Sequence, residues 1–525
     1  MKTNIITKIV YSILTLTMLS SCNNFLDLQP LTDVASATYY RDDATIQSGL
    51  AACYAGLYMV TSSGAKELNQ FPGATDDGYT TDNSWQMFLQ NTLNSNMTGD
   101  LNSMYSNAYE AIYKTNNFIA MVQPTNVIDE SLKARYIAEA KVLRAYFYFF
   151  VTNIFGDAVL TLSPEGEKSV IQSWTRTPRA VIKDSMVNDL VKAIKVLPQT
   201  AYNSGHIVSG TAALLAMRYK IMDYGTPDYA GIISLFESNF KTTNDANFGL
   251  VKKRQFKSMF DGNTSKNTYE SDVLSASDNK EVMLSARYST SATLSFPYPS
   301  GLVNPSICAR PELFNFFQFD DGTEFDTSGA NSKYDSNDSF KNRDGRLSFT
   351  ITNKKTLDTM AYYPVKNFLK TNNTYYAWKK YTPYYILIDR ALNVGEITTQ
   401  DIILMRYPEA LLLYAEALNE SGRTTDALAA LNVVRTRFLP ASTASGKDNV
   451  RKAIRYERRA EFAQEGYIRY LDLQRWNEMK DVMPNLPVSV LNQTVKCTFV
   501  SRQRFWPIPE YERLANTNIS QNDGY

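Results

Sequence analysis

The sequence is poor in the residues that most often bind metals. Its 525 residues include a single histidine, His206. This histidine has no cysteine or acidic partner at a spacing typical of zinc sites or histidine-based triads, so neither kind of site is predicted. Because it follows an Asn-Ser-Gly turn at residues 203–205, we expect its side chain to be exposed.

Cysteine is also scarce, with four residues in the whole chain. Setting Cys22 aside leaves Cys53, Cys308 and Cys497, an odd and sparse set that cannot form the framework of a disulfide-rich domain. These three allow one disulfide at most, and the sequence does not indicate whether any pair forms it.

The chain lacks an excess of charge of either sign. Lysine and arginine number 54 against 53 aspartates and glutamates, which gives a formal net charge of +1. Nucleic-acid binding needs a concentrated basic face, so this balance argues against a nucleic-acid partner.

One polar segment is similar to a calcium loop in its first positions. Residues 335–346 read DSNDSFKNRDGR, but Phe340 stands where an EF-hand has glycine, and no glutamate closes the loop. We interpret the segment as a turn. The sequence predicts no metal ligands and no cofactor, and leaves open whether a structural calcium binds.

No acidic residue precedes Asp27, and the only marked apolar run lies near the start of the chain. Lys2 and Lys8 precede the run IVYSILTLTML at residues 9–19, and Leu-Ser-Ser leads into Cys22. The run is too short to span a bilayer stably and is typical of a secretion signal, so we assign residues 1–21 as a signal peptide. The cysteine directly after it predicts a lipoprotein signal, with cleavage before Cys22 and acylation of that residue. The alternative is an ordinary secretory signal with a chance cysteine.

Aromatic residues are abundant, with 34 Tyr, 26 Phe and 5 Trp. Tyrosine combines an apolar ring with a polar tip, which suits half-wet surfaces. The composition fits either a large core or a ligand surface that stacks against flat apolar faces such as those of sugars.

Apolar periodicity predicts a mainly α-helical chain. The expected helices occupy residues 42–60, 102–122, 132–154, 178–197, 209–224, 401–422, 424–437 and 448–466. Residues 401–437 form a helix–turn–helix unit close to the tetratricopeptide period of roughly 34 residues. We therefore predict a tetratricopeptide-like scaffold of helix pairs.

The middle of the chain has a different character. Residues 225–400 are rich in Asn, Asp, Ser, Thr, Pro and Gly, with short strand-like pieces at Glu281–Tyr288 and Leu347–Thr352. No linker separates this part from its neighbours. We expect one domain over residues 22–525, with helical parts at 22–224 and 401–525 flanking a long loop-rich insertion at 225–400.

The densest run of charge lies between Arg451 and Arg475. Glu457, Glu461 and Glu465 recur at i, i+4 spacing, and Arg451, Arg455 and Arg459 do so in a neighbouring register. Two acids one turn apart can reach the distance that glycoside hydrolysis requires. The flanking arginines keep such acids ionised, however, and we predict a structural network of charges paired along the helix.

Five segments resemble motifs of one known family, in the same order along the chain. They are CNNFLDLQP (22–30), AEAKVLRAYFYFFVTNIFGDAVL (138–160), RYPEALLLYAEALNESG (406–422), AIRYERRAEFAQEGYIRYLDLQRW (453–476) and FWPIPEYERLANTNISQNDGY (505–525). Together with LNVVRTR (431–437), they identify the chain as similar to the SusD/RagB family. The resemblance implies a lipoprotein on the surface of the outer membrane of a member of the Bacteroidetes. It also implies a SusD-like, tetratricopeptide-like fold and a SusC-like TonB-dependent barrel as partner.

Most members of this family deliver glycans and some relatives handle peptides, so we predict a non-catalytic glycan-binding protein. The alternatives are a peptide-binding component of the same kind of importer, a surface glycosidase, and a lid whose partner supplies all specificity. The candidate ligand residues combine rings with polar groups in two loop regions. They are Asp76, Asp77, Tyr79, Asn83 and Trp85 in the first region, and Arg287, Tyr288, Phe296 and Tyr298 in the second. Trp85 and Tyr288 are the first choices, whereas Trp378 is expected in the core.

Overall fold

The fold is described from a computed structural model of the chain. The structure describes residues 39–61, 70–80, 82–96, 100–164, 171–202, 205–222, 225–241, 247–260, 274–275, 278–287, 307–329, 332–352, 376–381, 401–486, 489–490, 493–494 and 496–525. Statements of absence below refer to these residues.

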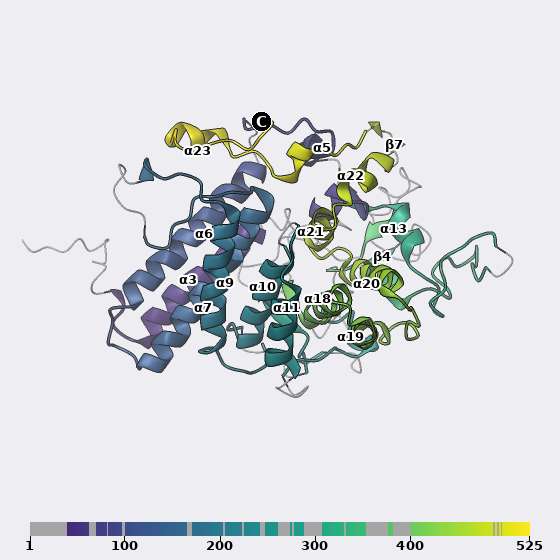
Figure 1. Ribbon diagram of the computed structural model, residues 1–525, viewed down its shortest axis with the longest axis horizontal. Coiled ribbons are helices and arrows are strands. Elements are labelled where there is room, and N and C mark those ends of the chain that lie inside the picture. Colours follow the sequence, from purple (N-terminus) through teal and green to yellow (C-terminus); the bar gives the residue numbers. More distant parts are fainter. Residues whose placement is uncertain are drawn as a thin grey trace, which may run out of the picture.

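The N-terminal part contains long helices, as the periodicity predicts (Figure 1). The helices that the sequence predicts in this part are α3 (Asp43–Thr61), α6 (Asp100–Val122), α7 (Glu130–Ile154), α9 (Arg179–Ile194) and α10 (Ser209–Ile221). A shorter segment between α3 and α6 contains β1 (Gly78–Thr80) and α5 (Asn83–Leu89).

Helix α7 is the most deeply buried of these helices. Its bulky apolar residues lie on a wide face, and the segment from Val142 to Ile154 is buried throughout. The helix ends before Gly156, whose φ of +80° is a conformation that glycine adopts without strain. This depth agrees with the prediction from its sequence.

The described residues of the middle part contain short helices and strands. These are α11 (Tyr229–Phe236), β2 (Val282–Ala286), β3 (Ile307–Ala309), α13 (Pro311–Phe316), α14 (Gly345–Thr350), β4 (Ile351–Thr352) and β5 (Ala377–Trp378). The strand predicted near Glu281 is confirmed as β2. The strand predicted from Leu347 is wrong for most of its length, because the Asp344 side chain accepts the Arg346 N–H and starts a helix there.

The C-terminal part returns to helix. It contains β6 (Ile402–Arg406), α18 (Tyr407–Glu420), α19 (Thr424–Arg435), α20 (Lys447–Phe462), α21 (Ile468–Arg475), α22 (Met479–Val482), β7 (Ser489–Val490), β8 (Gln493–Thr494) and α23 (Glu510–Ala515). Single helical turns lie at Phe71–Ala74, Glu237–Lys241, Lys253–Gln255, Met483–Asn485 and Ser501–Arg504.

The helix predicted to begin at Asp401 begins at Tyr407 instead. Residues Ile402–Arg406 form a strand that pairs antiparallel with β2, more than a hundred residues earlier in the chain. Pro408, near the start of α18, suits the first turn of a helix, where its missing N–H costs nothing. The local pattern is helical, and a distant partner strand overrides it.

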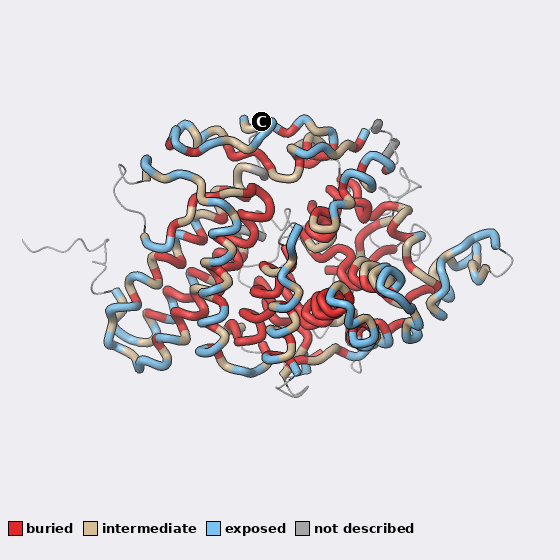
Figure 2. The backbone as a smooth tube through the Cα atoms, viewed as in Figure 1, coloured by how far each residue is buried: buried red, intermediate tan, exposed pale blue. Residues whose placement is uncertain are grey.

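Successive helices pack side by side across the molecule. α3 packs on α6, α6 on α7, α7 on α9, α9 on α10, α10 on α11, α11 on α18, and α18 on both α19 and α20. Figure 1 shows this array running from the purple and blue helices to the green ones, and Figure 2 shows α10 and α18 almost wholly buried. Such stacking of neighbouring helices is consistent with the predicted tetratricopeptide-like scaffold.

The C-terminal segment closes one end of this array (Figure 1). The Trp506 N–H donates to the Ile154 carbonyl at the end of α7 (2.8 Å), and its indole Nε1–H donates to the Tyr470 hydroxyl (3.1 Å). Asn522 donates to the Phe155 and Trp506 carbonyls. The segment that carries the last family motif therefore fastens the ends of α7 and α21 together.

A buried charge network joins α20 to the loop-rich part. Arg406 of β6 bonds Glu465 and Glu281 at 2.7 and 2.8 Å, and Arg346 of α14 reaches Glu461 at 3.1 Å. These three glutamates and Glu457 are at most 6 % exposed, which excludes Glu457 and Glu461 as an accessible pair for glycoside hydrolysis. The structural interpretation of these acids is confirmed.

The partners predicted for these glutamates were wrong. Arg451, Arg455 and Arg459 point away from them and pair with Glu420, Glu478 and the Asp76–Asp77 pair, respectively. The cations that reach the buried acids come from other elements instead: Arg346, Lys380, Arg406, Arg435 and Arg437.

Candidate ligand-binding site

The predicted aromatic platform around Trp85 is not at the surface. Trp85 has no exposed area, and its ring lies 4.9 Å from that of Phe71 and 5.2 Å from that of Trp506. Trp85 is buried for two reasons. Trp85, Phe88 and Leu89 form the inward face of α5, and the C-terminal segment places Trp506 against that face. Trp85 is a core residue in this structure, as Trp378 is, at 1 % exposure.

The neighbouring candidates Tyr79 and Asp77 are buried as well. Tyr79 lies in β1 with no exposure, its ring centroid 5.6 Å from the Arg310 guanidinium carbon. Asp77 accepts from Arg459 Nε at 2.7 Å, and Asp76 accepts two bonds of 2.9 Å from Arg469. Neither acid is available to a sugar hydroxyl, and both fasten this segment to α20 and α21.

These ion pairs also set the ionisation of Asp76. Burial opposes its charge, but Arg459 and Arg469 outweigh burial and lower the pKa of Asp76 to about 2. Burial raises the pKa of Asp77, which shares Arg459 with its neighbour.

Of the remaining candidate ligand residues, the structure describes only some. Tyr288, Phe296 and Tyr298 lie outside the described residues, and Asn83 is the first residue of α5, with its side chain also outside them. Arg287 is described and exposed. Among the predicted residues whose side chains the structure describes, Arg287 alone lies against a surface cavity.

This cavity has a volume of about 400 Å³, within the range of small-molecule sites. Three chain segments form it: one stripe of α3, the turn before α10, and the end of β2. Their lining residues are Gln47, Leu50, Ala51, Tyr54, Ala55, Leu57 and Tyr58; Tyr202, Gly205 and His206; and Ser285, Ala286 and Arg287. Gln47, Ala51 and Arg287 are exposed, so the cavity opens to solvent.

Glu139 of α7 organises one wall of the cavity from behind. Its side chain has no exposure and accepts from the Tyr54 hydroxyl at 2.6 Å and from Arg135 Nε at 3.1 Å. His206 Nδ1 lies 2.9 Å from the same carboxylate. Burial and the charge of Glu139 raise the pKa of Tyr54 well above its usual value, so its hydroxyl keeps its proton and donates.

The bond to Glu139 fixes the state of His206. A carboxylate accepts, so Nδ1 carries the proton, and Nε2 on the other corner of the ring is left for the cavity. The hydrogen bond to Glu139 raises the pKa of His206 above its usual value of 6.5, although partial burial opposes this. His206 is therefore not the isolated, exposed residue that its sequence context predicts; its side chain is 37 % exposed and has a buried acidic partner.

The opposite wall is held by backbone contacts. The Tyr58 hydroxyl donates to the Arg287 carbonyl, and the Tyr202 hydroxyl donates to the Ser285 carbonyl at 3.4 Å. Gly205 has a φ of +82°, and a Cβ there would lie 2.4 Å from Arg287 Nη1. A larger residue at position 205 would therefore meet the Arg287 guanidinium as well as strain the turn.

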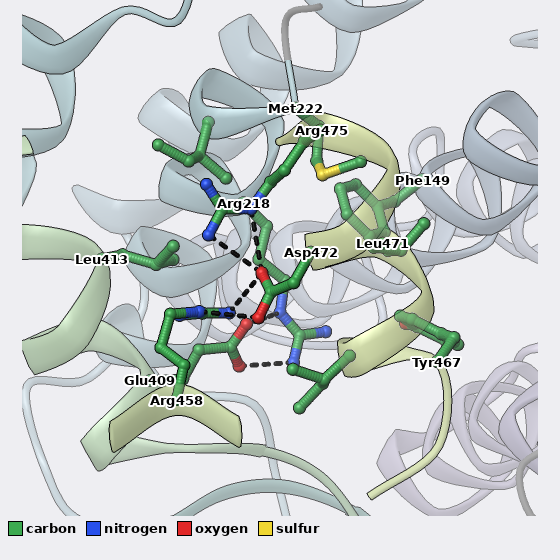
Figure 3. A pocket seen from close by; sticks show the side chains of 12 residues that line it. Phe149, Arg218, Met222, Glu409, Leu413, Arg458, Tyr467, Leu471, Asp472 and Arg475 are labelled. Carbon is green, nitrogen blue, oxygen red and sulfur yellow. Dashed lines mark hydrogen bonds and ion pairs between the residues drawn. The ribbon is translucent and has the colours of Figure 1, made fainter. Parts of the chain in front are cut away.

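A second cavity, in the middle of the molecule, is too small for a sugar (Figure 3). It holds about 20 Å³ between α10, α18, α20 and α21, which is room for about one water molecule. Arg218 donates to Glu409 at 2.9 Å, and Arg458 and Arg475 donate to Asp472 at 2.8 and 2.9 Å (Figure 3). This cavity is part of the packing between the two helical parts.

Chemically, the larger cavity combines three tyrosines with hydrogen-bonding groups. A tyrosine ring can cover the C–H face of a sugar, and His206 Nε2, Gln47 and the Arg287 guanidinium can bond its oxygens. Sequence reasoning missed Tyr54, Tyr58, Tyr202 and His206. The i, i+4 spacing of Tyr54 and Tyr58 was a usable signal for a shared helical face, but nothing local indicates that Glu139 lies behind it.

The stacked helices and their short strands define the chain as a mainly helical protein built from neighbouring helix pairs. Comparison with known proteins makes the assignment specific. The SusD family model matches residues 256–525, just over half of the chain, and a second model, described as starch-binding associating with outer membrane, matches residues 24–219. The chain therefore belongs to the SusD family.

Individual relatives are similar over nearly their whole length. A SusD-like protein of Formosa agariphila is 23% identical, over 98% of this chain and 97% of its own. A SusD-like protein structure from Bacteroides fragilis has a TM-score of 0.75 at 22% identity, covering 95% of this chain and 100% of that one. A SusD-like carbohydrate-binding protein of the same species gives 0.73 at 20% identity, over 92% and 100%. These structures share the fold.

The described residues contain no helix that is both long enough and apolar enough to cross a membrane.

Proposed function

We propose that the protein is a glycan-binding lipoprotein of the cell surface that captures oligo- or polysaccharide without cleaving it. It hands the ligand to a partner TonB-dependent transporter in the outer membrane. The family model described as starch-binding associating with outer membrane supports this proposal, as do similar structures named as carbohydrate-binding and laminarin-binding proteins.

The observation that carries the proposal is the cavity at α3. It is open to solvent, and its walls present the rings of Tyr54, Tyr58 and Tyr202 beside Arg287 and His206. Stacking and a few hydrogen bonds give moderate affinity, which suits a protein that must release its ligand to a partner. Residues 22–525 act as one unit anchored through Cys22, and the glycan reaches the cavity from the exposed side.

The experiment is a binding titration of residues 23–525 against a panel of neutral and acidic oligosaccharides. Tyr58→Ala removes a ring and should weaken binding about 3- to 10-fold, whereas Tyr58→Phe keeps the ring and most of the affinity. Tyr113→Ala, an exposed tyrosine on α6 outside the cavity, is the matched control.

Two results would overturn the proposal. One is a folded protein that binds no member of the panel, and a peptide ligand would then be the next hypothesis to test. The other is release of reducing ends with sustained turnover, which would identify an enzyme.

A further inference from the structure

The charged side chains that line the cavity all carry the same sign. Among the described lining residues, His206 and Arg287 are the charged or titratable bases, and no carboxylate is present. The tyrosine hydroxyls and the Gln47 amide complete the polar lining. A binding site for neutral sugars needs no such bias, because hydroxyls are bonded equally well by acids and amides.

The acid behind His206 does not cancel this bias. Glu139 has no exposure, and its two oxygens are occupied by Tyr54, Arg135 and His206. It faces α3 and the turn at His206 and contributes no surface to the cavity. Its effect on the cavity is transmitted by the imidazole, which it holds with Nδ1–H inward and Nε2 outward.

Asp401 forms an ion pair with Arg287 from outside the cavity. Asp401 Oδ2 lies 3.7 Å from Arg287 Nε, beyond hydrogen-bonding distance, and also accepts from Ser285 Oγ at 3.3 Å. Asp401 does not line the cavity, whereas the Arg287 side chain is 55 % exposed. The guanidinium therefore presents donors to the cavity in a fork that matches a carboxylate or a sulfate.

We propose that the cavity selects a sugar that carries an anionic group, either a uronate carboxylate or a sulfate ester. The Arg287 guanidinium binds the anion, and the rings of Tyr54 and Tyr58 contact the sugar. When His206 carries a proton on both ring nitrogens, its Nε2–H donates a second bond to the anion. This inference rests on the proposed function and names the class of glycan that the same site takes.

The test compares matched ligands that differ in one charge. Tetragalacturonate is titrated against its carboxyl-reduced neutral counterpart, and a sulfated carrageenan tetrasaccharide against its desulfated form. We expect at least tenfold tighter binding of one charged ligand over its neutral partner, and the pair that shows it distinguishes carboxylate from sulfate.

Variants connect this preference to the cavity. Arg287→Gln and His206→Gln should each reduce the ratio of charged-ligand to neutral-ligand affinity at least several-fold, because each variant loses a donor to the anion. Arg254→Gln, an exposed arginine outside the cavity, should leave both affinities unchanged. An identical loss in Arg254→Gln would overturn the assignment of the site.

The outcomes separate the two proposals. Equal binding of charged and neutral partners would overturn the selectivity and leave glycan binding intact. Binding of no glycan by a folded protein would overturn the proposed function itself. Selectivity that survives both cavity variants would overturn the role of Arg287 and His206.

Discussion

The protonation and orientation of the His206 ring are set by residues from other parts of the chain. Its proton on Nδ1 is held by a buried carboxylate, and three chain segments that are distant in sequence converge on it: α3 through Tyr54, α7 through Glu139 and Arg135, and the turn that carries it. One buried acid thus positions both a tyrosine hydroxyl and the imidazole.

The hydrogen bond to Glu139 predicts a pH dependence of stability. The folded-state pKa of His206 is raised above the usual 6.5, so its contribution is fully present below that pH and is lost as the pH rises through the folded pKa. The free energy of unfolding from denaturant titrations should fall between pH 6 and pH 8.5. The fall should be smaller in His206→Gln; equal falls in both proteins would contradict the bond.

Trp85 gives a second prediction, in stability rather than binding. Trp85→Ala removes a fully buried ring and should cost about 3–5 kcal/mol in free energy of unfolding. Trp85→Phe should cost much less, because it keeps the contact with Phe71. Any folded fraction of either variant should bind glycan with wild-type affinity. A loss of binding with unchanged stability would instead indicate that Trp85 contacts the ligand.

The candidate site could be predicted from the sequence only in part, and the reason is the same for each miss. Whether an aromatic residue faces solvent depends on what covers it, and Trp85 is covered by Trp506, which lies far along the chain. The Glu139–His206 pair is likewise created by folding. Arg287 was predicted because it adjoins aromatic residues in a loop, which is a local signal.

At the scale of elements, ion pairs fasten the segment around β1 to α20 and α21. Asp76 bonds Arg469 and Arg459, and Asp77 bonds Arg459. These contacts hold a short segment of the N-terminal part against two helices of the C-terminal part.

Acid should loosen this attachment. The pKa of Asp76 is lowered from 3.8 to about 2, so its contribution is present above pH 3.8 and is lost as the pH falls toward 2. Asp76→Asn should destabilise the protein by on the order of 2 kcal/mol at neutral pH and flatten the acid limb of stability against pH. Asp184→Asn, in which the replaced side chain is 78% exposed, is the control and should change neither. An acid limb of unaltered steepness in Asp76→Asn would refute this assignment.

Element boundaries show which parts of the fold are encoded locally. Helices with strong apolar periodicity, such as α7 and α19, begin and end within a few residues of their predicted limits. The error at Asp401 falls where pairing with a distant strand decides the conformation, whereas the error at Leu347 follows from the helix start capped by Asp344. Arg406 is an example: its side chain is 1% exposed and bonded to acids from two other elements, which no local pattern predicts.

Across the whole molecule, the cavity joins regions that the sequence keeps apart. Its walls come from α3 and the turn before α10, within the part matched by one family model, and from β2, within the part matched by the other. The pairing of β2 with β6 and the buried network on α20 fix β2 to the C-terminal helices. The relative position of the two helical parts therefore sets the width of the cavity.

Attachment of the whole molecule to the membrane can also be predicted. The signal peptide that ends directly before Cys22 predicts that acyl chains on this residue supply the anchor, each buried CH₂ contributing ~0.8 kcal/mol. Cys22→Ala should abolish labelling by a palmitate analogue and remove the protein from the outer-membrane fraction. Mass spectrometry of the wild-type protein should find an acylated peptide that begins at Cys22, and Cys53→Ala should leave both the label and the location unchanged. A wild-type mature chain that starts at another residue, or that is recovered freely soluble, would contradict the lipid anchor. The apolar run at residues 9–19 could not replace this anchor, because it is too short to span a bilayer stably.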